Sequence, residues 1–410
     1  MWPPGTVAIE DYEIILQPVP SSDPNDPLNW SKLRKAVHFT LISFFILWTF
    51  VQLDIGFTAW GDMISELEFS IDTMNEGAAT NYAGLAVGCI LFIPFVHKYG
   101  RRPLYLFSTA LQFAACIWQA KMQTKGDLIG SSLVSGLGGA ISETLVQITI
   151  ADLFFVHQHA TMNGFYLFST VTGAFLGPVA SGYVVVSQGW RWIWWWCVIF
   201  LGITLLLISV FFEESKYILL IVGGRTETGR GESRKDSASH STGQDDKKPD
   251  LTLTTERSLT VLDPNIKLKS YRQRLALITK TDASVIHHLY QPIVVLFSFP
   301  AVTYTALTFG STLAWFAIMT SVQATYLILP PYNFTAVSIG LMNLPPFIGS
   351  CLGFFVGGIM SDRSILWLAR RNRGIYEPEM RLWLALPSAL LLPAGILMFG
   401  FGLAHTAIKM

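Results

Sequence analysis

Long runs of hydrophobic residues, separated by short polar segments, make up most of this chain. A helix needs roughly 20 apolar residues to cross the hydrocarbon core of a bilayer, and these runs reach that length. Backbone N–H and C=O groups in lipid must be hydrogen-bonded within their own segment, so the runs are predicted to be helices rather than strands. The pattern therefore predicts an all-α polytopic membrane protein. Within a few residues at each end, the predicted spans are 36–57, 78–97, 103–120, 128–150, 164–187, 192–212, 291–320, 336–360 and 382–405.

The spans fall into two groups, six before a long polar segment and three after it. Residues 224–259 are rich in Gly, Ser, Thr and charged residues and too poor in apolar residues to fold alone, so they are predicted to be disordered. The less polar stretch 263–289 is predicted to contain one amphipathic surface helix. We expect four regions: a cytoplasmic N-terminal arm (1–35), a six-helix transmembrane bundle (36–217), a largely disordered cytoplasmic linker (218–289) and an incomplete three-helix C-terminal bundle (290–410).

Composition and charge support a membrane protein and give its orientation. Hydrophobic residues make up 51% of the chain and charged residues 14%, against about 25% charged residues in a typical soluble domain. Lys and Arg cluster before the first span, between the second and third, in the linker, and between the eighth and ninth. Short cytoplasmic loops carry an excess of positive charge, so the N-terminus and linker are predicted to be cytoplasmic, in a multi-pass protein of the plasma membrane. Because topology explains the basic clusters, no nucleic-acid partner is expected.

Two features lie on the predicted outer side. Five tryptophans between positions 190 and 196 open the sixth span, where indole rings favour the membrane interface; a stacking site for an aromatic ligand is the alternative interpretation. The loop between the seventh and eighth spans contains the sequon Asn333-Phe334-Thr335. Asn333 is therefore a candidate for N-glycosylation in a eukaryote.

The fifth span carries glycines and a proline in a specific order. Small residues four positions apart allow two helix backbones to approach closely, and a proline removes one internal hydrogen bond and bends the helix. Small-residue spacing alone is common in helical bundles, whereas the complete pattern is much more specific. It consists of Gly164, Gly173, Gly177, Pro178 and Gly182.

Two loops at matching positions in the two groups of spans are similar to one another. The loop after the second span contains Gly100-Arg101-Arg102, and the loop after the eighth contains Gly358 and Asp362-Arg363. A tight glycine turn with guanidinium groups offers charged partners to carboxylates and helix C-termini. The same element at matching positions predicts an internal repeat.

These motifs resemble the major facilitator superfamily from about residue 23 onward. The fifth-span pattern is similar to the superfamily's antiporter motif, and the two loops are similar to its cytoplasmic signatures. The superfamily plan has six helices in each half, so the resemblance implies a chain truncated after about nine spans. Further segments resemble fungal members of the 12-spanner drug:proton antiporter family: 23–30, 136–145, 151–157, 213–217 and 377–383.

Three positions depart from the family pattern. His97 stands where the family has an acidic residue, and Ile93 stands where it has the leading glycine of the first loop. Ser132 stands where the family has an arginine that is often placed in proton coupling, so proton coupling is left open by this position. The sugar-transporter signature after the sixth span is absent, which argues against sugars as substrates.

Ionisable residues inside a span are costly and therefore mark functional candidates. Asp54 in the first span and Glu143 in the fourth are candidates for binding a proton or a cationic group. The alternatives are an interfacial residue for Asp54 and a structural partner of a nearby helix end for Glu143. Asp152 is expected to pair with Arg101 or Arg102 and to latch the inner gate. Polar side chains that would line a cavity, or instead join helices, are Asn81, Tyr82, Gln147 and Tyr304.

The resemblance implies a secondary active transporter of small organic molecules, drug-, toxin- or organic-cation-like, that works by alternating access and is coupled to protons. The alternative is a truncated transporter-like membrane protein without transport activity of its own. Nothing in the sequence indicates an enzyme, a cofactor or a metal site, since it contains no metal-ligand cluster, nucleophile elbow or phosphate-binding glycine loop. The expected partners are the lipid bilayer, a small-molecule substrate and protons, and the chain is expected to be a monomer.

Overall fold

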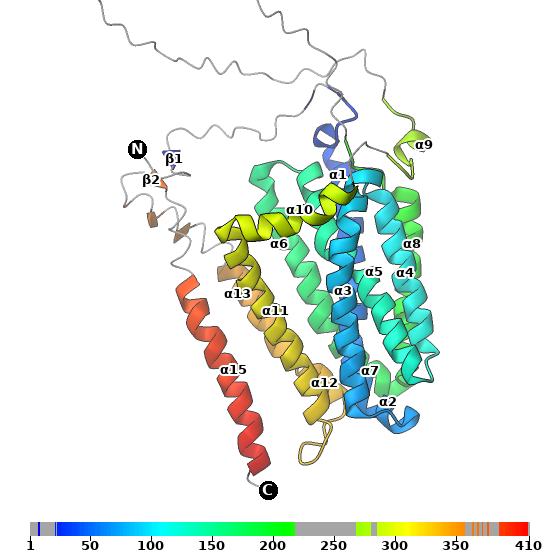
Figure 1. Cartoon of the computed structure of the whole chain (residues 1–410), viewed down its shortest axis with the longest axis vertical. Helices are drawn as coiled ribbons and strands as arrows, with labels where there is room; N and C mark the ends of the chain where they lie inside the picture. The colour runs from blue at the N-terminus through cyan, green and yellow to red at the C-terminus, as the bar shows by residue number, and fades with distance from the viewer. Residues whose placement is uncertain are drawn as a thin grey trace, which may run out of the picture.

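The computed structural model is a bundle of long helices (Figure 1). Within the residues that it describes, seven helical segments are long and apolar enough to cross a membrane. Strand structure in these residues is limited to β1 (Val7–Ala8), which pairs antiparallel with β2 (Ile375–Tyr376). The predicted all-α polytopic bundle is confirmed. The residues described are 7–8, 21, 23–217, 268–279, 285–356, 363–364, 367–368, 371, 375–376 and 385–408.

The first six predicted spans form the N-terminal part of the bundle. The arm enters through the short helix η1, and Ser31 then caps the first long helix by accepting a hydrogen bond from the Arg34 N–H. The fifth span is one continuous rod built from α6, the π-helical turn η3 and α7. The elements are η1 (Pro27–Asn29), α1 (Lys32–Asp54), η2 (Ile55–Ala59), α2 (Trp60–Leu67), α3 (Ile71–Tyr99), α4 (Arg102–Ala120), α5 (Lys125–Leu153), α6 (Val156–Val171), η3 (Thr172–Leu176), α7 (Gly177–Gln188) and α8 (Arg191–Phe211).

Helices α3 and α5 approach each other closely because small residues lie where they cross. A Cβ atom added at Gly84 would lie 2.7 Å from the carbonyl oxygen of Leu133, and one added at Gly88 would lie 3.2 Å from that of Leu137. At Gly136 an added Cβ would collide with the backbone carbonyl of Asn81. Such close approach of two backbones is what small residues permit between membrane helices.

Two buried apolar clusters fill this part of the bundle. One includes Tyr105 and Phe212, whose rings make an edge-on contact with centroids 4.9 Å apart. The other, near the opposite end, includes Trp60, Trp190 and Trp194. Each cluster draws side chains from helices that are far apart in the sequence, so the six spans form one packed unit.

The extent of the predicted seventh span is wrong. In place of one helix over 291–320, the chain divides at Phe299 into α10 (Val285–Ser298) and α11 (Pro300–Tyr326). Helix α10 lies across the ends of the long helices, whereas α11 runs along them (Figure 1). Pro300 occupies the first position of α11, and the residue before a proline is disfavoured in a helix, so the chain turns at Phe299, where φ is −116° and ψ is 106°.

The amphipathic helix predicted within 263–289 also has a different position. Of that stretch, α9 (Tyr271–Arg274) covers only four residues, and the helix that lies across the bundle is α10. The segment 224–259, predicted to be disordered, falls outside the described residues. We call the end of the bundle that carries α9, α10 and the arm the linker end. The remaining helices are α12 (Ala336–Leu341), α13 (Leu344–Phe355) and α15 (Ala385–Ile408).

Candidate functional site

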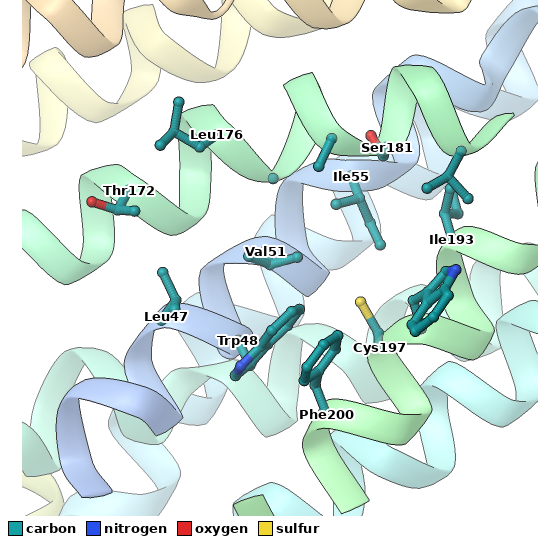
Figure 2. A pocket seen from close by; sticks show the side chains of 14 residues that line it. Leu47, Trp48, Val51, Ile55, Thr172, Leu176, Ser181, Ile193, Cys197 and Phe200 are labelled. Atoms are coloured by element: carbon teal, nitrogen blue, oxygen red, sulfur yellow. The ribbon is translucent and has the colours of Figure 1, made fainter. Parts of the chain in front are cut away.

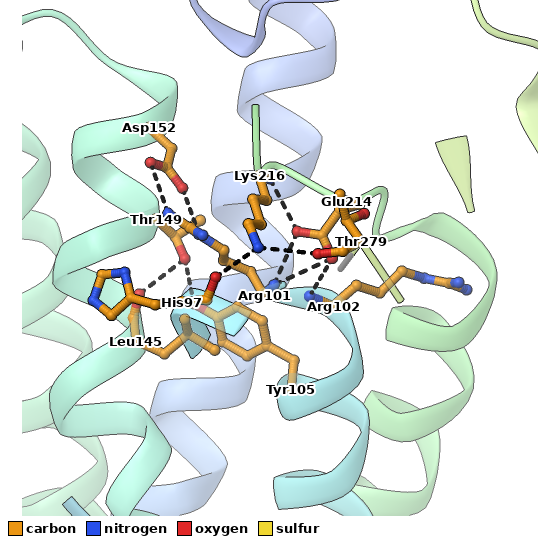
Figure 3. A network of polar contacts seen from close by, with 10 residues as sticks. All are labelled: His97, Arg101, Arg102, Tyr105, Leu145, Thr149, Asp152, Glu214, Lys216 and Thr279. Carbon is orange, nitrogen blue, oxygen red and sulfur yellow. Dashed lines mark hydrogen bonds and ion pairs between the residues drawn. The ribbon is translucent and has the colours of Figure 1, made fainter. Parts of the chain in front are cut away.

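A network of polar contacts joins the loop after α3 to the segment after α8 at the linker end (Figure 3). Gly100 ends α3 with a φ of +112°, a conformation that favours glycine. The backbone N–H groups of Arg101 and Arg102 donate to the Glu214 carboxylate, with N–O distances of 2.9 to 3.1 Å. A side chain at Gly100 would collide with that carboxylate. Position 100 therefore requires glycine for two reasons: the turn has a positive φ, and a side chain there would occupy the place of the Glu214 carboxylate.

Arg101 connects this loop to the end of α5. Its Nε donates to Oδ2 of Asp152 at 2.8 Å, and its Nη2 donates to Oδ1 at 3.3 Å, a two-point pairing that fixes geometry as well as charge. Arg102 takes a different direction, since its guanidinium donates to the backbone carbonyls of Ser209 and Leu275. Of the two arginines considered for Asp152, the structure brings only Arg101 to it.

Lys216 ties the same loop to the linker. Its ammonium donates to the carbonyl oxygens of His97, Lys98 and Thr279 at 2.6, 3.1 and 3.0 Å. Burial lowers the pKa of Lys216 from its ordinary value, the Arg101 charge lowers it further, and the Glu214 charge acts in the opposite direction. The Lys216 ammonium thus connects the end of α3 to the linker by hydrogen bonds to both.

His97, which departs from the family pattern, faces the surface helix α10. Its ring stacks on that of His288, with centroids 4.7 Å apart and an interplanar angle of 24°. The imidazole therefore makes an aromatic contact at this position. In the corresponding loop after α13, Gly358 and Asp362 lie outside the described residues, and Arg363 is exposed.

Glu143 lies in the middle of α5 and faces α6. It accepts a hydrogen bond from the Tyr166 hydroxyl at 3.2 Å. On its other side, Cys89 of α3 donates to the carbonyl oxygen of Ala140, at 3.6 Å, one turn before Glu143. Glu143 is therefore a partly buried carboxylate inside a membrane-spanning helix, and Tyr166 is its one hydrogen-bond partner among the described residues.

Asp54 ends α1 and is only 4% exposed. Tyr82 of α3 lies within electrostatic range of it, and the Tyr82 hydroxyl and the Asn81 Oδ1 atom are buried without a hydrogen-bond partner in the described part of the chain. Asn81 also lines an internal cavity of about 50 Å³ together with Ser132, the position where the family has an arginine. Asp54 thus lies near Tyr82, and Asn81, the residue before Tyr82 in α3, lines the cavity with Ser132.

The remaining predicted cavity residues are exposed. Gln147 is exposed on α5, and Tyr304 is 70% exposed on α11. Asn333 is exposed in the loop before α12, with a φ of +48°. The structure therefore separates the predicted polar side chains into a buried group and exposed positions.

The fifth-span glycines mediate close contacts with three other helices. A Cβ atom added at Gly177 would lie 3.3 Å from the Cα of Val51 in α1, and one added at Gly182 would lie 2.6 Å from the carbonyl oxygen of Ala336 in α12. A Cβ atom added at Gly173 would come still closer to the α1 backbone, 2.5 Å from the carbonyl oxygen of Leu47, and one added at Gly164 would meet the Phe354 ring of α13. Pro178 follows the π-helical turn η3. The pattern thus places α7 against both parts of the chain.

Most of the sequence also matches a known protein family. The sequence profile described as Major Facilitator Superfamily matches residues 20–408. The chain belongs to the Major Facilitator Superfamily. Membership places this facilitator among membrane transporters, and it confirms the resemblance to the superfamily that the motifs indicated.

Several relatives of this facilitator come from fungi. An uncharacterised MFS-type transporter of Schizosaccharomyces pombe is 33% identical over 98% of this chain and 73% of its own length. Protein HOL1 of Saccharomyces cerevisiae is 30% identical over 96% of this chain and 74% of its own length. The MFS transporter cpaT of Aspergillus oryzae is 27% identical over 93% of this chain and 70% of its own length.

The facilitator also has an apolar pocket that the sequence did not predict (Figure 2). It has a volume of about 330 Å³ and lies among α1, the fifth span and α8. Trp48 and Phe200 stack in it with ring centroids 3.8 Å apart and an interplanar angle of 9°. Ser181 contributes a hydroxyl, which is 2.8 Å from that of Thr58. The lining suits an apolar or aromatic group, which it would hold by contact rather than by charge.

Sequence reasoning missed the roles of Glu214, Lys216 and Tyr166. Glu214 and Lys216 belong to a segment that resembles the family after the sixth span, and the signal available was charge placed directly after an apolar run. Tyr166 gave no local signal, because its partner Glu143 is 23 residues away. Within the described residues, no group of three or more His, Cys, Asp or Glu side chains could hold a metal ion.

Proposed function

We propose that this facilitator moves small organic molecules of the drug, toxin or organic-cation type across the membrane, coupled to protons, by alternating access. In this mechanism two helical bundles rock about a binding site near the middle of the membrane. The protein acts as a monomer in the plasma membrane, and its linker end faces the cytoplasm. The basic side chains at that end, among them Arg34, Lys35, Arg101 and Arg102, agree with this orientation.

The proposal rests on the position of Glu143 inside the membrane-spanning helix α5. A carboxylate in the middle of a membrane helix is costly unless a proton, a cation or a hydrogen-bond network compensates its charge. Within the described part of the chain, Glu143 has one hydrogen bond, from Tyr166, so its charge state depends on what binds next to it. A proton and a cationic substrate would compete for this carboxylate, which is how an exchange of one for the other is coupled.

The proposed gate lies at the linker end. The Arg101–Asp152 pair joins the loop after α3 to the end of α5, and Glu214 and Lys216 hold the same loop to the segments after α8 and in the linker. Breaking this network would allow the inner ends of the helices to separate. Asp54, with Tyr82 near it, is the second proposed proton site.

The test is flux of a labelled organic cation into vesicles that contain the purified protein, with and without an imposed pH gradient. Glu143→Gln is expected to lower the gradient-driven flux by at least about tenfold, the loss that corresponds to ~1.4 kcal/mol. Glu76→Gln is the matched control, because Glu76 is exposed on α3, and it should keep the wild-type flux.

Two results would count against the proposal. Unchanged gradient-driven flux in Glu143→Gln would remove the assigned role of that carboxylate. Absence of flux in the wild-type protein for a panel of cations, weak acids and neutral drugs would favour the alternative, a transporter-like protein without transport activity of its own.

A further inference from the structure

A second polar cavity lies at the linker end, beside the gate network. It has a volume of about 50 Å³, several times the roughly 10–15 Å³ that one water molecule needs. Three segments that are far apart in the sequence enclose it: the arm with Trp30 and Arg34, the segment after α8 with Lys216, and the linker with Lys269 and Arg274. The cavity exists only because these segments meet.

The lining of this cavity is mainly cationic. Among the residues that the structure describes, Arg34, Lys216, Lys269 and Arg274 line it, against one carboxylate, Glu214, which already accepts three backbone hydrogen bonds. Glu213 pairs with Arg34 and with Arg274, the latter at 3.6 Å. For these described residues, the two carboxylates set against the four cations leave two positive charges.

The acidic residues of the arm that the structure describes, Asp23 and Asp26, do not line the cavity. Asp26 accepts hydrogen bonds from the Ser21 and Leu28 N–H groups of the arm itself, at 3.1 and 2.9 Å. Asp23 accepts hydrogen bonds from the Asn25 N–H at 2.7 Å and from the Tyr217 hydroxyl at 3.1 Å. Asp23 and Asp26 therefore stabilise the local structure of the arm, and they do not offset the excess positive charge of the described cavity lining.

Several donors around the cavity have no acceptor. Trp30 is only 7% exposed, and its Nε1 atom has no hydrogen-bond partner in the described part of the chain; the same holds for the Nε atoms of Arg34 and Arg274. The Arg34 guanidinium lies 3.7 Å from the centroid of the Trp30 ring. Leaving buried donors unpaired is costly, so an acceptor with several oxygens would satisfy what the protein side chains do not.

We propose that this cavity binds a phosphate group, either of a phospholipid headgroup or of a soluble phosphate compound. Several oxygens and a double negative charge match a site that offers the Nε–H groups of two guanidinium ions, an ammonium and an indole N–H. A basic pocket at the end of a membrane bundle is also where anionic headgroups bind. This site is separate from the proposed substrate site and takes a different class of ligand.

Binding at this site would hold the arm and the linker against the six-helix part. The linker segment leads directly through α10 to α11, which belongs to the other part of the chain. A phosphate bridging Arg34 and Lys269 would therefore restrain the movement of one part relative to the other. The site is a means of regulating the facilitator from its linker end.

The experiment uses the full chain in nanodiscs and two forms of the ligand. In the first arm, nanodiscs of phosphatidylcholine are titrated with pyrophosphate at constant ionic strength; in the second, nanodiscs contain phosphatidylinositol 4-phosphate. Binding is measured as the shift of the thermal unfolding midpoint. Lys269→Gln is expected to weaken the effect about tenfold, as expected for loss of one charge-assisted contact.

Arg272→Gln is the matched control. Arg272 is exposed on the short helix α9, three residues after Lys269, does not line the cavity, and carries the same charge, so its replacement should leave binding within about twofold, as for an exposed charge. Unfolding midpoints without ligand should be equal in both variants, which separates binding from folding.

Each outcome decides the proposal. Stabilisation in the lipid arm alone identifies a headgroup, and stabilisation by pyrophosphate alone identifies a soluble compound; both support a phosphate site. No saturable stabilisation in either arm overturns it. Equal weakening by Lys269→Gln and Arg272→Gln also overturns it, because the effect would then be general attraction by a basic surface. Because no transport is measured, failure here is distinguishable from failure of the proposed transport function.

Discussion

The most apolar stretches of helices α5 and α11 have the same mean hydropathy, but α5 is packed among other helices and α11 is largely exposed. The most apolar stretch of α5 is 61% buried inside the chain, whereas that of α11 is 6% buried. Glycines show the same contrast, since a Cβ atom added at Gly136 meets the backbone of α3, while one added at Gly310 meets no described residue within 4 Å. Hydropathy therefore decides that a helix lies in lipid, and small and polar residues decide which helices it packs against.

The two parts of the chain meet at their closest through α7 and α12. An added Cβ at Gly182 would lie 2.6 Å from the Ala336 carbonyl oxygen, and one at Gly340 would lie 2.6 Å from that of Pro178. The contact is reciprocal, with one glycine on each side. The fifth-span motif is thus the place where the tightly packed part reaches the loosely packed one.

The largest expected effect is on a glycine of the packed part. Gly136→Val places a side chain on the Asn81 carbonyl and should lower the free energy of unfolding by about 3 kcal/mol, the upper end of the range for overpacking. Gly310→Val, in open space on α11, should change it by less than about 0.5 kcal/mol. Unfolding of both purified variants is the measurement. Equal losses would show that the two parts are packed alike.

An intermediate effect is expected for the paired loops. Arg101→Gln removes two charge-assisted hydrogen bonds to Asp152 and should cost about 2–3 kcal/mol of unfolding free energy. The matched variant in the second loop, Arg363→Gln, changes an exposed side chain and should cost less than about 0.5 kcal/mol. If Arg363→Gln costs as much as Arg101→Gln, the second loop is held as firmly as the first.

The smallest effect on folding is expected in the loop between α11 and α12. Asn333 is exposed there, so an N-glycan can be attached without displacing packed side chains, provided that the loop lies on the outer side. Treatment with an endoglycosidase should increase electrophoretic mobility of the protein expressed in a eukaryotic cell. Asn333→Gln should abolish that increase and change the unfolding free energy by less than about 0.5 kcal/mol. An untreated protein that already migrates like Asn333→Gln would contradict the outer placement of this loop.

Much of the fold could be predicted from local sequence. The six first spans follow from runs of apolar residues, and the Thr124–Asp127 capping box sets the start of α5 as its sequence signal implies. Pro300 is the sequence signal for the break at Phe299. A single proline does not interrupt a long run of apolar residues, so hydropathy alone does not reveal the break. The expected seventh span was misplaced for that reason.

The candidate site was only partly predictable. The Arg101–Asp152 contact was anticipated because both residues match the family pattern at helix ends. The Glu214 carboxylate, more than 100 residues from the loop that it binds, and the stacked Trp48–Phe200 pair of the apolar pocket were not. Contacts of this kind depend on which helices are neighbours, and one sequence does not contain that information.

The sequence by itself determined the solvent, the helices and the superfamily of this protein. Apolar length selects lipid, lipid requires helices, and the glycine and arginine motifs mark the family. Only the tertiary structure decided that α5 is a core helix and α11 a peripheral one, and that the arm, the α8 end and the linker enclose a cationic cavity. The physical reason is that burial and charge pairing are properties of neighbours in space, and residues such as Arg34 and Glu213, 179 positions apart, become neighbours only after folding.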